Sequence, residues 1–365
     1  CVLVTGATGN LGTALISRLL SEPNKRVFAL ARARDAEHLA ERRSKIIRNL
    51  GGETDFERLV FVQGDVSQPD LGLSLEDHGK VLAQVNSIIH AAASVRFDMP
   101  SHLAAQQNIR GTESVLDLAW QIQRQGKFHR LDYVSTCYIA GDRKGRVYEH
   151  ECDKGQGFRN SYEWSKCQSE VLIHKAIEDG LYATIHRPSI LAGDSRNGAT
   201  RSFTALYWPL KVYARGWWRV LPGRPDALID VVPLDFVVEA ITQLRRNPDT
   251  IGMCFHLASG EAAARVDDLA LRLQELLDGH PVRYVDQRLW RIMVRPLMVS
   301  VLRLIPHGDK IRRGTDVYMP YFESNPLFDT SNTNRYLVDI KPPPVLTYFD
   351  RIVRFACACD FGKNL

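Results

Sequence analysis

Short apolar runs alternate with longer amphipathic stretches through the first half of the chain. The apolar runs predict buried strands, and the stretches with apolar residues at helical spacing predict helices. Continuous apolar strands separated by helices are typical of a parallel sheet that is covered on both faces. The pattern predicts strands at residues 1–5, 26–31, 59–63, 87–90, 131–135 and 183–186, and helices at 13–20, 35–50, 101–125 and 161–178.

This order of elements predicts an α/β fold with a doubly wound, Rossmann-type parallel sheet, whose ligand lies at the carboxyl ends of the strands. After residue 188 the pattern changes, and aromatic residues, proline and arginine become dense. Strands near 228–232 and 253–257 and helices at 233–246 and 266–277 are expected there. We expect residues 1–200 to form the sheet domain, with 226–260 returning to it, and residues 201–225 and 261–365 to form a smaller, mostly helical substrate lobe.

The composition narrows the class of protein. The 365 residues are 45% apolar and 24% charged, as in ordinary globular proteins, and the net charge is +5. No block of lysine and arginine stands out, so nucleic acid is not expected as a partner, whereas a phosphorylated cofactor or an anionic carrier suits this charge. No apolar run is long enough to span a membrane.

The cysteines favour a reducing compartment. Their number, seven, is odd and they form no C-x-x-C pair, so we expect free thiols in a cytoplasm. Cys357 and Cys359 are close in sequence, but no neighbouring cluster completes a metal site, and no metal is expected. Because the first predicted strand starts at residue 1, we expect no signal peptide. We expect instead that the start of the chain is trimmed or that the chain is an excised domain. The oligomeric state is left open.

A glycine-rich turn, GATGNLG, joins the first predicted strand to the first helix. Gly6 allows a tight turn, Gly9 lets the backbone approach a phosphate, and Gly12 lets the helix pack close to the strand. The bare N–H groups and the helix N-terminus favour a pyrophosphate, although an ordinary strand-to-helix connection is the alternative. The residues expected to hold a dinucleotide are Gly6, Thr8, Gly9, Asn10, Leu11 and Gly12.

A Y-x-x-x-K pattern lies on the helix predicted at residues 161–178. Positions four apart share a helix face, so Lys166 is expected beside Tyr162, where its charge favours the phenolate and lowers the tyrosine pKa. Thr136, at the end of a predicted strand, can place a hydroxyl near the same point. The pattern alone also occurs on surface helices, but here it follows the glycine turn and the threonine in the order that an acid–base site beside a dinucleotide needs.

These motifs together resemble the extended short-chain dehydrogenase/reductases and, within them, the thioester reductase and fatty acyl-CoA reductase branch, the NAD-binding "male sterility" type. A weaker likeness to the family's last helices covers FDTSNTNRYL and PPPVLTYFDRIVRF. The main matching runs, within residues 1 to about 245, are VTGATGNLG, GDV, IIHAAASVRF, NIRGT, YVSTCYIAG, YEWSK, HRPSILAGDSRNG and IDVVPLDFVVEAI.

The resemblance implies a role for each matching residue. Tyr162 is the expected proton donor, Lys166 its partner and a ribose ligand, and Thr136 a second hydroxyl at the substrate carbonyl. Asn108 matches the family's active-site asparagine, although a polar residue inside a helix can instead bond to backbone. The further cofactor contacts implied are Asp65 and Val66 at the adenine, Ala91 and Ala92 at a strand end (helix-start packing is the alternative for both), Pro188 under the nicotinamide, and Ile190.

Charge at the end of the second predicted strand indicates NADPH. NAD enzymes commonly have an acidic residue there, which accepts from the ribose 2′-hydroxyl. This chain has Arg32, whose guanidinium suits a 2′-phosphate, whereas Asp35 comes one turn too late for the ribose. Arg42 is the second expected contact, since the resembling branch also carries arginine there. Two solvated arginines are the alternative.

Three other side chains near the strand ends are expected to be structural. Cys137 could attack a thioester, but strand alternation points it away from the face of Thr136, and no histidine has a spacing that would activate it. We expect Cys137 in the core. His90 and His186 end strands near the site, where a tyrosine already fills the acid–base role.

Two segments outside the cofactor half, residues 203–218 and 289–305, bear on the substrate. They can be core helices of the lobe, walls of an acyl tunnel, or a face that lies on a membrane, and the sequence leaves these interpretations open. Their arginines could meet the phosphates of CoA or of a phosphopantetheine arm. The residues concerned are Trp208, Lys211, Arg215, Trp217, Trp218 and Arg219 in the first segment, and Arg291, Arg295, Pro296 and Arg303 in the second.

The resemblance implies NADPH-dependent reduction of an acyl thioester, carried by CoA or by a phosphopantetheine carrier protein, to an aldehyde and, with a second hydride, to an alcohol. A cytoplasmic location is expected, and peripheral membrane contact is compatible with it. One alternative is other chemistry of the superfamily, namely a nucleotide-sugar epimerase or dehydratase or a sterol-type dehydrogenase. Another is a non-catalytic NADPH sensor, which would need neither Tyr162 nor Lys166.

Overall fold

The centre of the molecule is a seven-stranded sheet in the order β12-β7-β5-β4-β1-β2-β3, in which every neighbouring pair is parallel. The structure is a computed structural model and describes residues 1–50, 56–216, 220–302, 308–322 and 325–363. The order of the strands reverses between β1 and β4, where this topology places a ligand. The strands are β1 (Val2–Thr5), β2 (Val27–Ala31), β3 (Leu59–Gln63), β4 (Ser87–His90), β5 (Arg130–Val134), β7 (Ala183–Pro188) and β12 (Cys254–Leu257).

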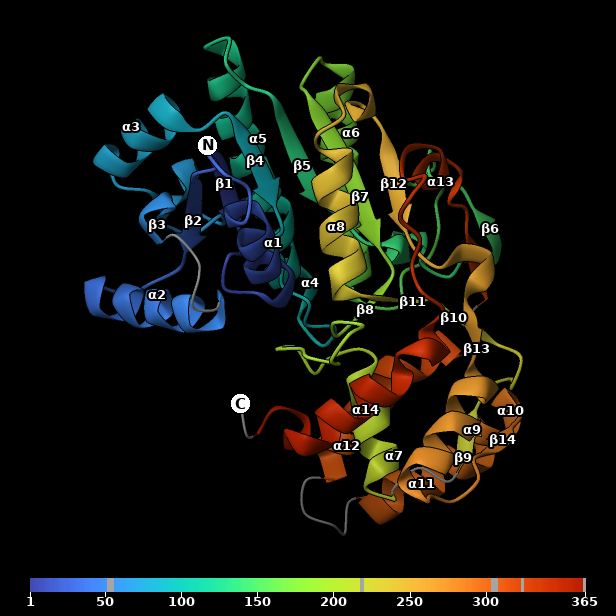
Figure 1. Ribbon diagram of the computed structural model, residues 1–365. Helices are drawn as coiled ribbons and strands as arrows, with labels where there is room; N and C mark the ends of the chain where they lie inside the picture. The colour runs from blue at the N-terminus through green and yellow to red at the C-terminus, as the bar shows by residue number, and fades with distance from the viewer. Residues whose placement is uncertain (51–55, 217–219, 303–307, 323–324, 364–365) are drawn as a thin grey trace.

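Helices cover both faces of the sheet, so the predicted α/β fold is confirmed (Figure 1). Three helices pack on one face around one apolar core, and three pack on the other face around a second core. A sheet that is covered by helices on both faces requires strands that are apolar along their whole length. The first set is α1 (Asn10–Leu20), α2 (Ala36–Leu50) and α8 (Leu234–Leu244), and the second is α3 (Leu75–Gln84), α5 (Arg110–Arg124) and α6 (Ser161–Glu178).

Several local features were not predicted. The helix expected at 101–125 is α4 (Ser101–Ala104), a π-helical turn over Ala105–Ile109, and then α5. Helix α3 was missed, although the Ser74 hydroxyl caps it by accepting from the Asp77 N–H at 3.1 Å. The single strand expected at 228–232 is two strands, β10 (Leu228–Ile229) and β11 (Val231–Pro233), separated by the buried Asp230, whose carboxylate accepts from two backbone N–H groups.

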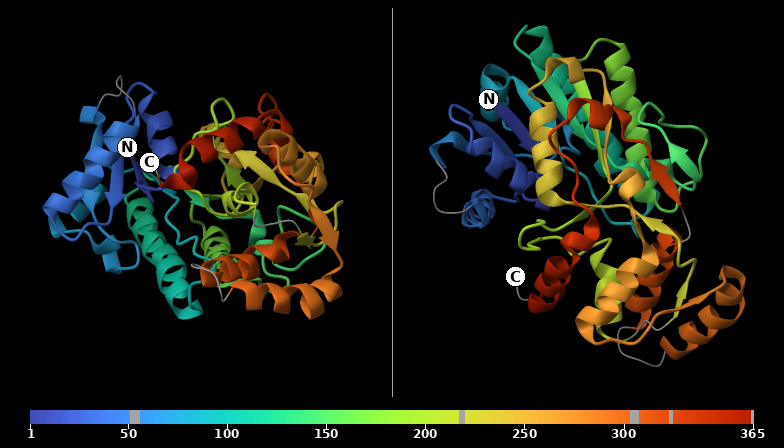
Figure 2. Two further views of the ribbon diagram at one scale, coloured as in Figure 1. Left: turned by 90° about the horizontal axis from the view of Figure 1, so that it is seen from below. Right: turned by 45° about the vertical axis from the view of Figure 1, so that its right-hand side comes forward.

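A second, mostly helical region, here called the second layer, has its own apolar core, to which α7 (Tyr207–Ala214), α9 (Val266–Leu277) and α14 (Phe349–Ala358) contribute. It lies in the lower half of Figure 1, and Figure 2 gives a further view. Of the strands within residues 226–260, β12 joins the main sheet, while β11 pairs with β8 (Ile190–Ala192) and β10 with β13 (Ala264–Arg265). The remaining elements are β6 (Gly145–Val147) with β15 (Pro326–Phe328), β9 (Val220–Pro222) with β14 (Arg283–Val285), α10 (Gln287–Leu289), α11 (Arg295–Leu302), α12 (Gly308–Tyr318) and α13 (Ser331–Tyr336). Over the ranges that the structure describes, no helix combines the length and the apolar character needed to cross a membrane.

Candidate active site

The glycine turn brings the start of α1 against the ends of β1 and β4. Gly6 has a φ of +71°, and a Cβ atom there would lie 2.6 Å from the Ala91 carbonyl oxygen. A Cβ atom on Gly12 would lie 2.1 Å from the carbonyl oxygen of Gly6, so only glycine lets the helix approach this closely. The result is a bare backbone surface at a helix N-terminus, an arrangement that suits a pyrophosphate.

One continuous cavity of about 850 Å³ runs from this turn, past the ends of β5 and β7, into the second layer. Most of the predicted site residues line it, and five do not. The predicted residues in its wall are Gly6, Thr8, Gly9, Asn10, Leu11, Gly12, Arg42, Ala91, Thr136, Tyr162, Lys166, Pro188 and Ile190; those outside the wall are Arg32, Asp65, Val66, Ala92 and Asn108.

Three of these five residues have other contacts at the strand ends. The Asp65 carboxylate accepts from the N–H and the hydroxyl of Ser67, at 3.0 and 2.9 Å. The Val66 side chain lies against Gly111 of α5. The Ala92 N–H donates to the Thr5 hydroxyl at 3.3 Å. Asp65, Val66 and Ala92 therefore shape the loops behind the cavity.

Tyr162 and Thr136 lie together in the cavity wall. Helix α6 begins after Asn160, whose side-chain oxygen accepts from the Glu163 N–H at 3.0 Å, and this cap places Tyr162 in the first turn. Burial raises the pKa of Tyr162, and the Thr136 hydroxyl offsets this in part as a hydrogen-bond partner. The pKa of Tyr162 is thus raised, and not lowered as the spacing to Lys166 suggested, because burial is the largest effect.

Lys166 is held by the end of β5. Its ammonium donates to the Tyr133 hydroxyl at 2.7 Å and to the Val134 carbonyl oxygen at 2.8 Å, and it lies 4.2 Å from the centroid of the Tyr133 ring. Burial lowers the pKa of Lys166 to about 7, although the Glu170 carboxylate acts in the opposite direction. The amine is therefore poised between its charged and neutral forms near neutral pH.

This burial predicts how stability depends on pH. Because the pKa of Lys166 falls from 10.5 to about 7 on folding, the unfolded chain binds more protons between these pH values, and stability should rise with pH across that window. The rise should be absent from Lys166→Met. Thermal melting of both proteins between about pH 7 and pH 10.5 measures the difference. Melting temperatures that change in parallel would show that Lys166 does not titrate in this way.

Asn108 lies in the π-helical turn and holds the chain behind the site. Its side-chain oxygen accepts from the Ser94 N–H at 2.8 Å, and its amide donates to the Ser94 carbonyl at 3.3 Å and to the Ser165 hydroxyl at 2.8 Å. π-Helical turns occur frequently at functional sites. Asn108 thus joins the loop after β4 to α6 between Tyr162 and Lys166, and acts there as a positioning group.

Helix α2 brings positive charge to the cavity beside the glycine turn. Arg42 lines the wall together with Lys45, His38 and Glu41, and the Arg42 Nε atom donates to His38 Nε2 at 3.0 Å. Arg32 is exposed and lies outside the wall. Asp35, which the sequence placed one turn too late for the ribose, accepts from the His38 N–H at 2.8 Å at the start of α2.

The far end of the cavity is apolar and is built by the second layer. The first of the two substrate segments contributes to this wall, whereas no described residue of 289–302 does, so among the described residues only the first segment supports the tunnel interpretation. Arg215 pairs with Asp360 at 3.1 Å and Arg295 with Asp316 at 3.0 Å, and neither lines the cavity. Trp217, Trp218, Arg219, Arg303 and the Arg291 side chain lie outside the described residues. The apolar wall includes Leu206, Leu210, Ile229, Val266, Leu269, Ala270, Leu273 and Phe349.

The side chains predicted to be structural are buried and bonded. The Cys137 thiol donates to the Arg187 carbonyl oxygen at 3.0 Å, and burial raises its pKa, which does not favour a nucleophile. His90 Nδ1 lies 2.7 Å from the Thr5 hydroxyl, and burial, with Lys166 nearby, lowers its pKa to about 3. His186 Nε2 lies 3.0 Å from Asp132 Oδ1 in the core. The predicted position of Cys137 in the core is confirmed, and His90 and His186 are buried as well.

The sequence analysis missed the aromatic residues around Tyr162. The Phe97 ring lies 5.5 Å from the Tyr162 ring and 5.8 Å from the Tyr321 ring. The Tyr321 hydroxyl donates to Glu163 Oε1 at 2.6 Å and so ties the second layer to α6. Tyr133, the partner of Lys166, had one local signal, since it comes three residues before Thr136 on a strand that leads to the site.

Comparison with known proteins shows the family to which this chain belongs. A family model described as male sterility protein, of NAD-binding type, matches residues 4–241. The nonribosomal peptide synthetase asaC of Aspergillus flavus is 27% identical over 93% of this chain and 34% of its own length. The putative fatty acyl-CoA reductase CG8303 of Drosophila melanogaster is 26% identical over 77% of this chain and 59% of its own length. The chain thus spans about a third of the first relative and less than two thirds of the second.

A solved structure supports the same placement. The terminal R domain from the myxalamid PKS-NRPS biosynthetic pathway has a TM-score of 0.86 and 27% identity, and the match covers 100% of this chain and 92% of that one. Because the match extends over the whole chain, it includes both the sheet and the second layer.

Proposed function

Because this chain belongs to the NAD-binding family described as male sterility protein, we propose that it is a nicotinamide-dependent oxidoreductase that reduces an acyl thioester to an aldehyde. The observation that carries the proposal is the single cavity, which joins a dinucleotide-type glycine turn and Tyr162 to a deep apolar end. An apolar end suits an acyl chain better than a sugar, and the intact Tyr162 and Lys166 pair suits an enzyme better than a sensor. The names of the relatives, a nonribosomal peptide synthetase and a fatty acyl-CoA reductase, support the same class of substrate.

The residues of the wall fit a nicotinamide dinucleotide, since Gly6, Gly9 and Gly12 line the cavity at the α1 N-terminus and leave bare backbone there for a pyrophosphate. The glycine turn would hold the pyrophosphate, Lys166 the ribose, and Pro188 and Ile190 the nicotinamide end. When bound, the cofactor supplies a hydride to the thioester carbonyl carbon. Thr136 and Tyr162 donate hydrogen bonds to the carbonyl oxygen as it gains charge, and Tyr162 gives it a proton. The resulting hemithioacetal collapses to an aldehyde and a free thiol.

The thiol that carries the acyl group is CoA or the phosphopantetheine arm of a carrier protein. The seven cysteines are free, which fits a reducing compartment such as the cytoplasm. The proposal is tested by following NADPH oxidation with a panel of acyl-CoAs and the matching acyl-pantetheines, with and without a carrier protein. Aldehyde formation from any acyl thioester supports the proposed function, whereas no turnover across the panel contradicts it.

We also propose NADPH as the preferred cofactor, because Arg42 and Lys45 line the cavity and Arg32 lies at the end of β2. Loss of a charge-assisted phosphate contact costs about 1.5–3 kcal/mol. Arg42→Ala, and likewise Arg32→Ala, should therefore raise the KM for NADPH about tenfold or more and leave that for NADH nearly unchanged. Steady-state kinetics with both cofactors measures this.

Arg43→Ala is the matched control for the cofactor prediction. Arg43 is the next residue of α2, is exposed, and lies over the Phe61 ring at 5.9 Å, outside the cavity wall. Its substitution should change neither KM. Equal use of NADPH and NADH by the unmodified protein would rule out the proposed preference.

A further inference from the structure

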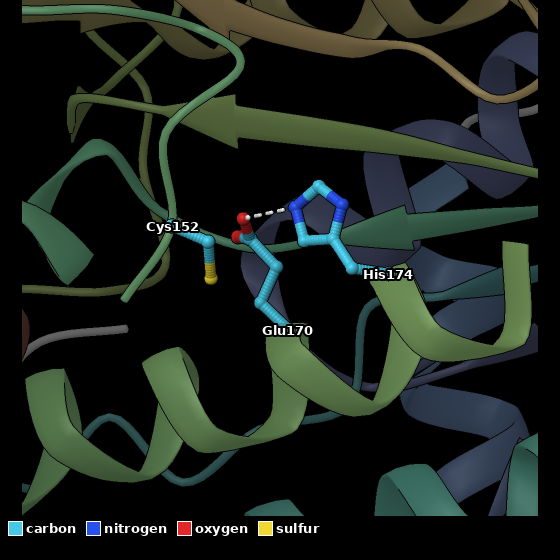
Figure 3. Close-up of side chains that lie close together, drawn as sticks. All are labelled: Cys152, Glu170 and His174. Atoms are coloured by element: carbon cyan, nitrogen blue, oxygen red, sulfur yellow. Dashed lines mark ion pairs between the residues drawn. The ribbon is translucent and has the colours of Figure 1, made fainter. Parts of the chain in front are cut away.

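A cluster of potential metal ligands lies on α6, apart from the cavity. Glu170 and His174 are one turn apart on this helix, and Cys152 reaches them from the segment that precedes it (Figure 3). One ligand atom from each of the three side chains lies within 4.8 Å of the other two. None of the three belongs to the cavity wall described above, so this cluster needs its own explanation.

The imidazole supplies an independent sign of a ligand. His174 Nε2 is buried but has no hydrogen-bond partner among the described residues, and Glu170 Oε1 lies 3.4 Å away as an ion pair. The contact with Glu170 is thus an ion pair without hydrogen-bond geometry, and an ion between the three side chains would give the imidazole nitrogen a bond. The His174 side chain as a whole is 30% exposed, so an ion can reach it from solvent.

We propose that Cys152, Glu170 and His174 bind a zinc ion. A thiolate, an imidazole and a carboxylate are the three ligand types that Zn²⁺ takes, whereas the thiolate disfavours Mg²⁺ and Ca²⁺. Three protein ligands leave one tetrahedral position. The candidates for this position are water and Cys167 of α6, whose thiol interacts with that of Cys152.

The charges around the cluster suit such an ion. The Glu170 carboxylate is buried and forms an ion pair with the buried guanidinium of Arg187. The Arg187 Nε atom donates to the two carboxylate oxygens at 2.9 and 3.2 Å, as outer-shell groups commonly do for metal-bound carboxylates. Binding of one Zn²⁺ releases one proton from the Cys152 thiol and one from the His174 imidazolium, so the net charge of this buried group does not change.

The ion would connect two parts of the chain that bear on the candidate active site. Cys152 lies in the segment between β6 and α6, and Lys166 lies one turn before Glu170 on the same helix. Zinc should therefore raise the melting temperature of the protein, because a ligand that binds only the folded state stabilises it.

The test uses the reduced chain in a Cys357→Ser, Cys359→Ser background, so that the thiols near the C-terminus do not bind metal. Zinc binding is measured by competition with a chromophoric chelator, and Co²⁺ substitution is followed by its thiolate-to-cobalt charge-transfer absorption. We expect one ion per chain and a thiolate band. Cys152→Ser should remove that band, and Cys152→Ser and His174→Gln should each weaken zinc binding by at least about tenfold. His280→Gln, at an exposed histidine elsewhere, is the control and should have no effect.

Two outcomes would overturn the proposal: no bound ion in the parent protein, or equal zinc affinity in the parent and in both variants. Glu170 is left unchanged because it pairs with the buried Arg187. If both variants fail to fold, the parent protein still decides the question, since a Co²⁺ spectrum without a thiolate band excludes Cys152 as a ligand. All of these readouts are independent of the reductase activity.

Discussion

Tyr162→Phe should lower kcat by about 10²–10⁴-fold and leave NADPH binding nearly unchanged. The substitution keeps the aromatic ring beside Phe97 and removes only the hydroxyl that gives a proton to the substrate oxygen. Lys166→Ala should reduce both turnover and cofactor affinity, because the proposed function assigns the lysine to the ribose as well. Steady-state kinetics with an acyl thioester, together with a direct NADPH titration of each variant, measures the two effects separately.

Tyr182→Phe is the matched control for this prediction, since that phenol is 48% exposed and does not line the cavity. Its turnover should match that of the unmodified protein. A Tyr162→Phe variant with near-normal kcat would mean that another group donates the proton or that the carbonyl binds elsewhere. The raised pKa of Tyr162 fits a donor that holds its proton until the substrate oxygen gains charge.

Lengthening the acyl chain by four carbons should raise kcat/KM by about two orders of magnitude. Each buried CH₂ contributes about 0.8 kcal/mol, and the far wall of the cavity offers apolar side chains from α7, α9 and α14. Ala270→Trp places an indole in that wall and should remove the gain for long chains while short chains react as before. Values of kcat/KM against acyl-CoA chain length, below micelle formation, measure both effects.

Leu271→Trp offers the matched control on the same helix. Leu271 follows Ala270 on α9, but its side chain is 53% exposed and lies outside the cavity wall. This variant should keep the chain-length profile of the unmodified protein. A flat profile in the unmodified protein would remove the tunnel interpretation and favour a small or polar acyl group.

Local sequence was sufficient for the parts of the site that depend on local geometry. The glycine turn needs Gly6 and Gly12 because the backbone approaches too closely for a Cβ atom, and such a need is visible in seven consecutive residues. The Tyr162 and Lys166 spacing likewise follows from one turn of helix. The seven-stranded sheet was predictable for a similar reason, since strands buried on both faces have continuous apolar runs.

Contacts between distant segments were not predictable in the same way. The partners of Lys166 are Tyr133 and the Val134 carbonyl on β5, which the spacing of Tyr162 and Lys166 alone did not suggest. Cys152 and His174 are far apart in sequence, so the cluster on α6 becomes apparent only in the folded chain.

Apolar composition was also an incomplete guide to burial. In the segment from residue 289, Trp290 is buried, but Ile292 and Leu297 are 73% and 67% exposed. Ile292 and Leu297 therefore lie on the surface, whereas a core helix or a tunnel wall would have covered them, since helical periodicity alone does not say which face is covered.

The proposed reaction passes a hydride from the cofactor to a thioester carbonyl carbon in this cavity. The most direct measurement is transfer of deuterium from NADPH labelled at nicotinamide C4 on the reactive face, with the aldehyde trapped and analysed by mass spectrometry. We expect one deuterium at C1 of the aldehyde, and loss of this product in Tyr162→Phe. An unlabelled aldehyde, or release of the thiol without an aldehyde, would contradict it.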